Sequence, residues 1–408
     1  MRFLLLVLLI WTFPAIGAEA FWPGWLGPNR DGWVGTFKAP KTWPAKLQTA
    51  WRIKVGEGYG TPLVIGDRVF QHARLGEKEV VWALDLKTGR KVWQTYFETP
   101  FKIGGGGEKH GKGPKANPAY ANGRLFVMSI AGRLSALDAA EGKVLWRADY
   151  DSKFQPSHPR WGMCSSPVVD ANRVIAHFGN DESGLLAAFD VRSGKEIWTQ
   201  GNDLPSYSSP TVVTHKGIRQ VIEWNRRALV GVNVKTGNLL WEYPFPRVGT
   251  NQNMPTPAFY QGKVLLGGEN RGLHGIEPKL ENGKWTVSSY WSNRKVSLDM
   301  ATAIVNDGRL YGLSHLSRGR IFCADSHTGE ILWQSPERTA DNATFLAFSG
   351  YIMVLLNKGE LRVVKADAER YEQVAAWQVA DTPTWAAPVL LQQGVLIKDR
   401  DHLTFWTF

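Results

Sequence analysis

Short apolar runs alternate with polar turns along almost the whole chain, and no segment carries a sustained apolar stripe of helical period. The runs are four to six residues long, rich in β-branched and aromatic side chains, and bounded by Gly, Asn or Asp. Such runs predict antiparallel strands joined by tight turns. They come in groups of four, and most groups open with a small residue before a proline, as in Thr61-Pro62 and Ser209-Pro210. The pattern therefore predicts an all-β protein made of four-stranded units.

The third and fourth runs of each group share a recurring motif. An Asp-like residue is followed by a Thr-Gly or Ser-Gly turn and, eight residues after the Asp in each clean copy, by a Trp. The clean copies are residues 82–93, 134–146, 187–198, 230–241 and 321–333. Degenerate copies of the motif lie around Glu277 and Asp367, and successive Asp-like positions are 42 to 53 residues apart. Four-stranded units repeated at this period indicate a β-propeller.

The number of blades follows from the starts of the first strands. Eight starts are visible, but residues 386–408 supply only about three strands. Residues 47–55 carry Trp51 in the motif position and would provide the missing outer strand. We therefore predict one domain, residues 47–408, folded as an eight-bladed propeller whose last blade is completed by an N-terminal strand, which removes two exposed sheet edges. Seven blades is the alternative count.

The motif tryptophans are predicted to be structural. A buried Trp removes about 150–250 Å² from water, worth ~4–6 kcal/mol before the entropy cost. We expect these side chains to pack between neighbouring blades. They are Trp51, Trp93, Trp146, Trp198, Trp241, Trp291, Trp333 and Trp377.

The repeat resembles that of the pyrroloquinoline-quinone (PQQ)-like propeller family, whose units carry Ala-Xaa-Asp-Xaa-Xaa-Thr-Gly-Xaa-Xaa-Xaa-Trp. The resemblance covers about residues 47–408. It implies one of two kinds of protein: quinoprotein dehydrogenases, which hold the quinone and Ca²⁺ on the propeller axis, or non-catalytic scaffolds similar to the outer-membrane assembly factor BamB.

The N-terminus resembles a secretory signal. A basic start, an apolar run and Ala18-Glu19-Ala20 predict a signal peptide over residues 1–20, cleaved before Phe21. The apolar run is too short for an ordinary membrane span, although an uncleaved anchor is the alternative. No Cys lies near the cleavage site, so we expect a periplasmic or extracellular protein, exported across the inner membrane, that is not a lipoprotein. Residues 21–46 are predicted to form a Trp- and Pro-rich arm around the outside of the propeller.

Composition narrows the partners. The two cysteines, Cys164 and Cys323, are predicted to lie too far apart for a disulfide. The net charge of +11 favours an anionic ligand, a polysaccharide or an envelope protein. No nucleic-acid-binding motif is present and the basic residues are dispersed, so we do not expect a nucleic acid partner. The oligomeric state is left open.

The loops that join the second to the third strand (B–C) and the fourth to the next first strand (D–A) share one face in propellers of this family. They are rich in basic residues, which indicates either a cationic funnel for a ligand or simply solvated turns. The longest irregular stretch, residues 98–117, contains four consecutive glycines and is interpreted as a lid over the axis or as a plain insertion. Residues 150–166 form the second candidate loop. The candidate ligand-binding residues are Lys112, Arg133, His158, Arg160, Trp161, Arg227, Arg271, Arg320 and Trp385.

Catalytic equipment is not evident. The chain lacks vicinal cysteines, metal-binding His or Cys spacings and a nucleophile elbow. The repeat aspartates precede tight turns, where a carboxylate accepts backbone N–H bonds. We therefore predict no catalytic residue, metal or cofactor, with PQQ and Ca²⁺ kept as the less favoured alternative. The main hypothesis is a secreted, non-catalytic binding platform that uses its basic loop face. The alternatives are a quinone-dependent oxidoreductase with atypical ligands and an envelope-assembly scaffold.

Overall fold

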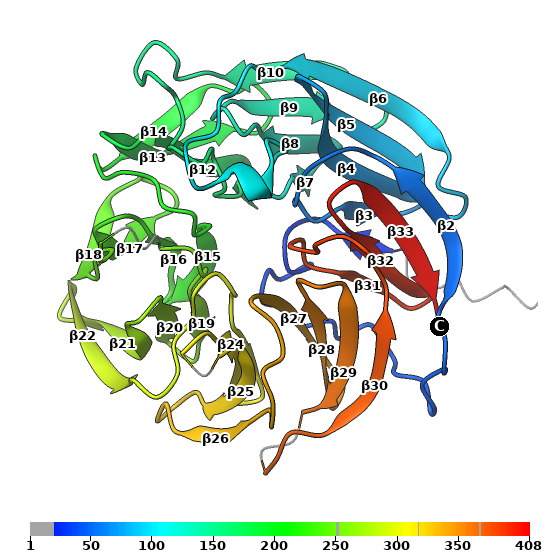
Figure 1. Cartoon of the computed structure of the whole chain (residues 1–408). Helices are drawn as coiled ribbons and strands as arrows, with labels where there is room; N and C mark the ends of the chain where they lie inside the picture. The colour runs from blue at the N-terminus through cyan, green and yellow to red at the C-terminus, as the bar shows by residue number, and fades with distance from the viewer. Residues whose placement is uncertain (1–19, 250–252, 317, 367–368) are drawn as a thin grey trace, which may run out of the picture.

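The structure is a computed structural model that describes residues 20–249, 253–316, 318–366 and 369–408. The predicted signal peptide, except for Ala20, and the degenerate repeat position Asp367 lie outside these residues. The fold is all-β, with eight sheets arranged around a central axis (Figure 1). The predicted eight-bladed propeller is confirmed, and the alternative of seven blades is wrong.

The blades follow one another along the chain, and each contains four antiparallel strands from the axis to the perimeter. Blade 1 contains β3 (Leu63–Ile65), β4 (Arg68–Leu75), β5 (Lys78–Asp85) and β6 (Lys91–Glu98). Blade 2 contains β7 (Ala119–Ala121), β8 (Arg124–Met128), β9 (Leu134–Asp138) and β10 (Val144–Ala148). Blade 3 contains β11 (Val168–Asp170), β12 (Arg173–Gly179), β13 (Gly184–Asp190) and β14 (Glu196–Gln200). Blade 4 contains β15 (Thr211–His215), β16 (Ile218–Trp224), β17 (Ala228–Asn233) and β18 (Leu239–Pro244).

The second half of the ring repeats this order. Blade 5 contains β19 (Ala258–Tyr260), β20 (Lys263–Gly268), β21 (Gly272–Glu281) and β22 (Lys284–Asn293). Blade 6 contains β23 (Ile304–Asn306), β24 (Arg309–Ser314), β25 (Arg320–Asp325) and β26 (Ile331–Gln334). Blade 7 contains β27 (Ala343–Phe348), β28 (Tyr351–Leu356), β29 (Glu360–Lys365) and β30 (Gln373–Gln378). Blade 8 contains β31 (Val389–Leu391), β32 (Gly394–Lys398), β33 (His402–Thr407) and, from the other end of the chain, β2 (Gln48–Lys54).

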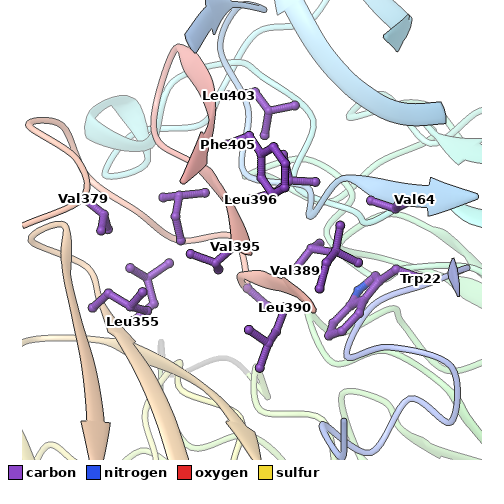
Figure 2. Packing of buried hydrophobic residues seen from close by; sticks show 14 of the residues in the cluster. Trp22, Val64, Leu355, Val379, Val389, Leu390, Val395, Leu396, Leu403 and Phe405 are labelled. Carbon is purple, nitrogen blue, oxygen red and sulfur yellow. The ribbon is translucent and has the colours of Figure 1, made fainter. Parts of the chain in front are cut away.

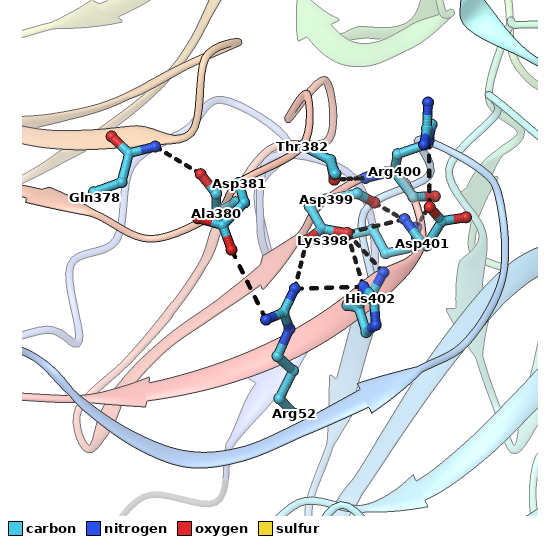
Figure 3. A network of polar contacts seen from close by, with 10 residues as sticks. All are labelled: Arg52, Gln378, Ala380, Asp381, Thr382, Lys398, Asp399, Arg400, Asp401 and His402. Atoms are coloured by element: carbon cyan, nitrogen blue, oxygen red, sulfur yellow. Dashed lines mark hydrogen bonds and ion pairs between the residues drawn. The ribbon is translucent and has the colours of Figure 1, made fainter.

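The pairing of β2 with β33 closes the ring, as predicted. The register runs from Gln48 opposite Thr407 to Lys54 opposite His402. A polar cluster sits at this junction (Figure 3). Arg52 of β2 lies 3.6 Å from a carboxylate oxygen of Asp399 and 3.5 Å from Nδ1 of His402. The strand borrowed from the N-terminus is therefore held by side chains as well as by its backbone ladder.

The repeat motif is explained by a contact between successive blades. In blade 1 the carboxylate of Asp85 accepts hydrogen bonds from the backbone N–H and the hydroxyl of Thr88, which shapes the turn and lowers the pKa of Asp85. Gly89 follows with φ of +68°, and a Cβ at Gly89 would lie 2.7 Å from the ring of Trp51 in the preceding blade. The indole N–H of Trp51 donates to the carbonyl of Leu86, the residue after the Asp. The Asp and the Gly of one blade and the Trp of the preceding blade thus form one contact between the two blades, which we call the joint.

The same joint recurs around the ring. A Cβ on the turn glycine would collide with the preceding blade's Trp at Gly142, Gly194, Gly237 and Gly329. Indole N–H groups donate to the carbonyl that follows the Asp-like residue from Trp93, Trp146, Trp198 and Trp291. Among the contacts of the described residues, two depart from it: Trp241 donates to the side chain of Gln220, and Trp377 donates to the carbonyl of Pro44.

A β-bulge precedes most of the motif tryptophans. In blade 3, Ala188 pairs with Trp198 but Phe189 pairs with Glu196, which leaves Ile197 as the extra residue. Ile197 is 39% exposed, whereas Trp198 is 8% exposed. A bulge twists an outer strand and blunts its free edge, which discourages pairing with another chain.

The first part of the N-terminal arm, residues 20–34, lies across the inside of the ring, so the expectation that the arm wraps the outside is wrong there. Its strand β1 (Phe21–Trp22) pairs with β3, the innermost strand of blade 1. Trp22 is buried beside Val64 and the inner strand β31 of blade 8 (Figure 2). Further along, Trp33 bridges to Ala347 of blade 7. Entry into the ring buries Trp22, Leu26 and Val34 of the arm and so removes their apolar surface from water. The last part of the arm does reach the perimeter, because the ring of Trp43 packs on Trp377 of the outer strand β30.

Candidate functional site

The candidate site is a cavity of about 380 Å³ on the propeller axis. The arm closes one end of the cavity through Trp25 and Leu26, while the loop of residues 98–117 lies over the other end, which we call the mouth. A cavity of this size is at the lower end of the range of small-molecule sites. Two rings of side chains, with one residue from each blade in each ring, form most of its wall.

The lower ring is a hydrogen-bonded belt. In six of its links, a backbone N–H of one blade donates to the side-chain oxygen of the equivalent residue in the next blade, at 2.7–3.1 Å. Its members are Thr61, Asn117, Ser166, Ser209, Thr256, Thr302, Thr344 and Ala387. The small residues that begin each group of strands therefore both fit the crowded axis and connect the blades.

The belt is interrupted at blade 7. Ala387 has no side-chain oxygen, and the hydroxyl of Thr344 is buried with no hydrogen-bond partner among the described residues. The side-chain oxygen of Asn342, two residues earlier, is likewise buried and unpartnered within that part of the chain. Both residues line the cavity. This side of the wall therefore contains two buried polar atoms that have no hydrogen-bond partner among the described residues.

The upper ring lies two residues before the belt in each blade. All eight of its residues line the cavity: Tyr59, Lys115, Cys164, Tyr207, Met254, Met300, Asn342 and Trp385. Burial raises the pKa of Tyr59 to about 12 and that of Cys164 to about 11, and it lowers the pKa of Lys115. The ring is thus mostly aromatic or thioether in character, with one cation whose Nζ donates to the carbonyl of Trp161.

The two loops singled out from the sequence interlock over the mouth. The backbone N–H of Gly104 donates to the carbonyl of Arg160 at 2.8 Å, and the indole of Trp161 donates to the carbonyl of Gly105. A Cβ at Gly104 would lie 2.0 Å from the side chain of Arg160, and one at Gly107 would lie 2.8 Å from the ring of Trp161. The glycine run therefore allows residues 98–117, including the 3₁₀ turn η1 (Glu108–His110), to lie against residues 150–166.

This interlock can be tested through Cys164, which lies in the cavity. We expect Gly104→Val to push the two loops apart, expose Cys164 and lower its pKa. Alkylation of Cys164 by iodoacetamide should then accelerate about tenfold for each unit by which the pKa falls, because the thiolate is the reactive form. Cys323, buried in blade 6, is the internal reference, and mass spectrometry of the two cysteine peptides reports both rates. Equal acceleration at both cysteines would indicate general loosening and contradict a local lid.

Aromatic rings surround the mouth in two groups. Trp161 stacks on Tyr207 with ring centroids 6.0 Å apart and an interplanar angle of 28°. Trp385 contacts Tyr59 on one side and His110 of the lid on the other, at 6.3 and 4.9 Å. Burial lowers the pKa of His110. An aromatic environment of this kind, with Lys109 and Lys115 beside it, can hold a planar or apolar group.

Of the nine candidate residues, the structure places only Trp161 and Trp385 in the cavity wall. Arg160 and His158 belong to the same loop as Trp161, and the ring of His158 packs on Phe101 at 4.8 Å. Arg320 begins strand β25 and is exposed. Their roles in binding stay predictions.

Much of the predicted positive charge is already paired within the chain. Arg133 contacts both Asp149 and Asp151, and these carboxylates raise its pKa. The other pairs are Arg227 with Asp203, and Lys112 with Glu77. Arg271 instead lies over the rings of Trp224 and Phe245, at 4.9 and 5.0 Å, and its burial lowers its pKa to about 10. These basic residues therefore form ion pairs or ring contacts within the chain, and several of the ion pairs hold neighbouring loops together.

Apart from Trp385, the upper ring was missed from the sequence, although its spacing was visible. Tyr59, Tyr207 and Met254 each stand two residues before the small residue that begins a blade. Aligning the repeats on that small residue would have selected the whole ring. The residue types differ between blades, so no motif marks them individually.

The residues of the upper ring do not fit a Ca²⁺ ion. Calcium takes six to eight oxygen ligands, mainly carboxylates and carbonyls. No carboxylate is present in the ring, and no group of three His, Cys, Asp or Glu side chains suited to a metal occurs in the described part of the chain.

Cys164 and Cys323 are not joined by a disulfide. Within the residues described, no helix has the length and apolarity to cross a membrane.

Comparisons with known proteins agree with this architecture. BamB of Yersinia pestis, an outer membrane protein assembly factor, is 26% identical over 374 residues, which cover 87% of each chain. Quinohemoprotein alcohol dehydrogenase ADH-IIG of Pseudomonas putida is 28% identical over 159 residues, which cover 38% of this chain and 21% of the dehydrogenase.

Among solved structures, BamB of Moraxella catarrhalis aligns with a TM-score of 0.63 at 16% identity, covering 89% of this chain and 98% of that one. Quinohemoprotein alcohol dehydrogenase of Comamonas testosteroni aligns with a TM-score of 0.70 at 13% identity, covering 96% and 81%. The family model described as outer membrane protein assembly factor BamB matches residues 48–108 and 102–335. The chain therefore belongs to this BamB-like family of PQQ-type propellers.

Proposed function

We propose that this chain is a non-catalytic scaffold of the cell envelope that binds a partner protein on its mouth face. The supporting observation is that two loops of this face expose large apolar side chains, while ion pairs hold neighbouring loops together. Val248, in the D–A loop after blade 4, is 56% exposed, and Leu316, in a B–C loop of blade 6, is 44% exposed. Exposed apolar side chains on loops that are held in one conformation can serve as contact residues for a partner protein.

The framework beneath these loops supports this proposal. Arg226 and Arg227 each pair with a carboxylate of a neighbouring loop, Asp181 and Asp203 respectively. Loops fixed in this way lose little conformational entropy on binding, which favours a specific partner. Family membership points the same way, because curated relatives that match 87% and 78% of this chain are assembly factors.

The experiment substitutes one apolar residue on each surface. We expect Val248→Glu to weaken capture of the partner at least about tenfold, which corresponds to 1.4 kcal/mol, within the cost of removing one contact residue. The matched control is Leu239→Glu on the outer strand β18, because Leu239 is 45% exposed but lies on the perimeter. A photo-crosslinking residue at 316 or at 239, followed by mass spectrometry of the envelope fraction, identifies the partner. Equal loss of capture in both variants, or crosslinks only from 239, would place the binding surface elsewhere.

A quinone-dependent oxidoreductase is the second candidate, and the aromatic axial cavity favours it. Trp161, Tyr207 and Trp385 would have to hold the flat cofactor, although the ring lacks calcium ligands. Adding pyrroloquinoline quinone with Ca²⁺ should then produce a protein-bound absorbance band and dye reduction with alcohols. A band without dye reduction would leave a binding site and reject the oxidoreductase.

A further inference from the structure

The loops of the mouth face over blades 4, 5 and 6 are hydrogen-bonded side by side. Nη1 of Arg271, in the B–C loop of blade 5, donates to the carbonyl of Pro246 in the loop before that blade, at 2.8 Å. The hydroxyl of Ser297 in the next loop donates to the carbonyl of Gly268, and its backbone N–H donates to the hydroxyl of Ser314 at 3.0 Å. The loops therefore form one surface, made of residues 245–249, 268–272, 294–299, 314–316, 318–320 and 335–341.

Four exposed cations of this surface have no acidic partner. Arg294 and Lys295 follow β22 of blade 5, and Arg318 and Arg320 lie in the B–C loop of blade 6. None of the four forms an ion pair among the described residues, where the ion pairs nearest in sequence belong to other side chains. Leu316, in the same loop as Arg318, is 44% exposed. We call the four cations the basic patch.

The carboxylates on the same loops do not neutralise the basic patch. Asp341 forms an ion pair with Arg338. Glu269 and Asp299 are half-buried, burial raises the pKa of both, and the charge of Asp299 adds to the shift of Glu269. The remaining carboxylate, Glu337, is exposed in the loop after β26. The surface thus combines four exposed, unpaired cations with one exposed, unpaired carboxylate.

The backbone that carries Arg318 is held in one conformation. Arg318 has a φ of +58°, which is unfavourable for a residue with a side chain and persists only where the surroundings enforce it. The next residue, Gly319, has a φ of +75°, and a Cβ there would lie 1.8 Å from the carbonyl oxygen of Ala340. The backbone N–H of Thr339 donates to the carbonyl of Gly319 at 2.8 Å. A backbone fixed in this way loses little conformational entropy when a partner binds.

We propose that the basic patch binds an acidic segment of the partner protein, with Leu316 as an apolar contact within it. This inference rests on the protein-binding function proposed above and specifies the chemistry of the partner. Three of the four cations are arginines, whose planar fork matches the two oxygens of a carboxylate. Unpaired charges of one sign on a protein surface attract a segment of the opposite sign and set its register.

An anionic membrane surface is the other chemistry that a basic patch can meet. Binding in a membrane interface combines basic residues with a broad apolar face that enters the lipid. The loops of blade 6 offer one large exposed apolar side chain, Leu316, among the described residues. The surface therefore favours a protein segment, and lipid binding is an outcome that the experiment distinguishes.

The experiment uses the full-length chain and a fluorescein-labelled peptide of three Glu-Glu-Leu repeats, with binding followed by fluorescence anisotropy. We expect the double variant Arg318→Glu with Arg320→Glu to weaken binding at least about tenfold, because like charges then face each other. Leu316→Gln should weaken it at least about threefold. Wild-type affinity should fall as the salt concentration rises, because salt screens exposed charges.

The matched control is Arg192→Glu with Lys195→Glu, which reverses two exposed cations in the C–D turn of blade 3, on the opposite face. It should bind the peptide within about twofold of wild type, and both double variants should melt like wild type, because exposed substitutions cost little. Equal weakening in both double variants would assign the binding to net charge and overturn the proposal. Binding of phosphatidylglycerol vesicles that is lost in Arg318→Glu with Arg320→Glu, without any peptide binding, would also overturn it.

A crosslinking arm separates this inference from the function on which it rests. A photo-crosslinking residue at position 316 is placed in wild type and in the variant Arg318→Glu with Arg320→Glu. We expect wild type to capture an envelope protein through a segment rich in Asp and Glu, and the variant to capture at least about tenfold less. Capture that persists in the variant would overturn the acidic segment alone. No capture by wild type would overturn the protein-binding function itself.

Discussion

Replacing Trp198 with alanine is expected to lower the free energy of unfolding by about 3–5 kcal/mol, the usual cost of truncating a buried aromatic side chain. Trp198 of blade 3 donates its indole N–H to the carbonyl of Val234 in blade 4 at 2.9 Å and packs on Gly237. The substitution removes both contacts and leaves a cavity between two blades. Because each blade touches only its neighbours, the rest of the ring cannot collapse into that space.

Urea unfolding followed by fluorescence and by circular dichroism measures the effect. The adjacent bulge residue provides the control: Ile197→Ala, at a half-exposed side chain, should change the free energy of unfolding by less than about 1 kcal/mol. If the two variants lose similar stability, the joint between the Trp and the glycine turn is not what fastens the blades.

The same joint shows why the fold could be predicted from the sequence. The Asp, the turn Gly and the Trp interact at fixed spacing within a repeat and between consecutive repeats. Asp190, Gly194 and Trp198 therefore appear as a pattern along the chain, and their physical roles are evident from residue type alone. The same pattern predicted that the strand containing Trp51 closes the ring. The last blade lacked its own outer strand and motif Trp, and Trp51 stands at that position of the motif.

The candidate site was much less predictable. Its wall depends on which side chains point to the axis, and the upper ring has a different residue in each blade, such as Cys164, Met300 and Asn342. The basic loop residues were visible, but their partners, such as Asp151 for Arg133, come from another loop whose path a repeat pattern does not specify. The arm lies outside the repeat, so nothing in the periodicity indicated that its first part enters the channel.

A buried ion pair between blades 3 and 4 gives the second large effect. Nδ1 of His177 in β12 lies 2.6 Å from a carboxylate oxygen of Glu223 in β16, and Nε2 lies 3.0 Å from the carbonyl of Asp203. Both partners are acceptors, so both ring nitrogens must carry hydrogen, and the imidazole is charged. Burial opposes this charge, but Glu223 outweighs it, and the pKa of His177 is raised above its usual value.

We expect Glu223→Gln to lower the free energy of unfolding at pH 6 by about 3–5 kcal/mol, because it leaves the imidazolium buried without its counter-charge. The matched control is Glu182→Gln, since Glu182 is exposed in blade 3, the blade that contains His177. That substitution should cost less than about 0.5 kcal/mol. A similar loss in both variants would mean that the effect arises from net charge.

The difference in stability between wild type and Glu223→Gln should depend on pH. The folded pKa of His177 lies above its unfolded value of about 6.5, so the pair contributes fully below that pH and its contribution is lost as pH rises through the folded pKa. Lys398 changes the stability with pH in the opposite direction. Its side chain is buried, its Nζ donates a hydrogen bond to the carbonyl of Gly58, and burial lowers its pKa to about 7. Its contribution makes wild type more stable as pH rises from about 7 toward the unfolded lysine value. Wild type and Glu223→Gln both contain Lys398, so the difference between their free energies of unfolding, measured at several pH values from 5.5 to 9, isolates the contribution of His177. A difference that stays constant or grows as pH rises would contradict a charged His177.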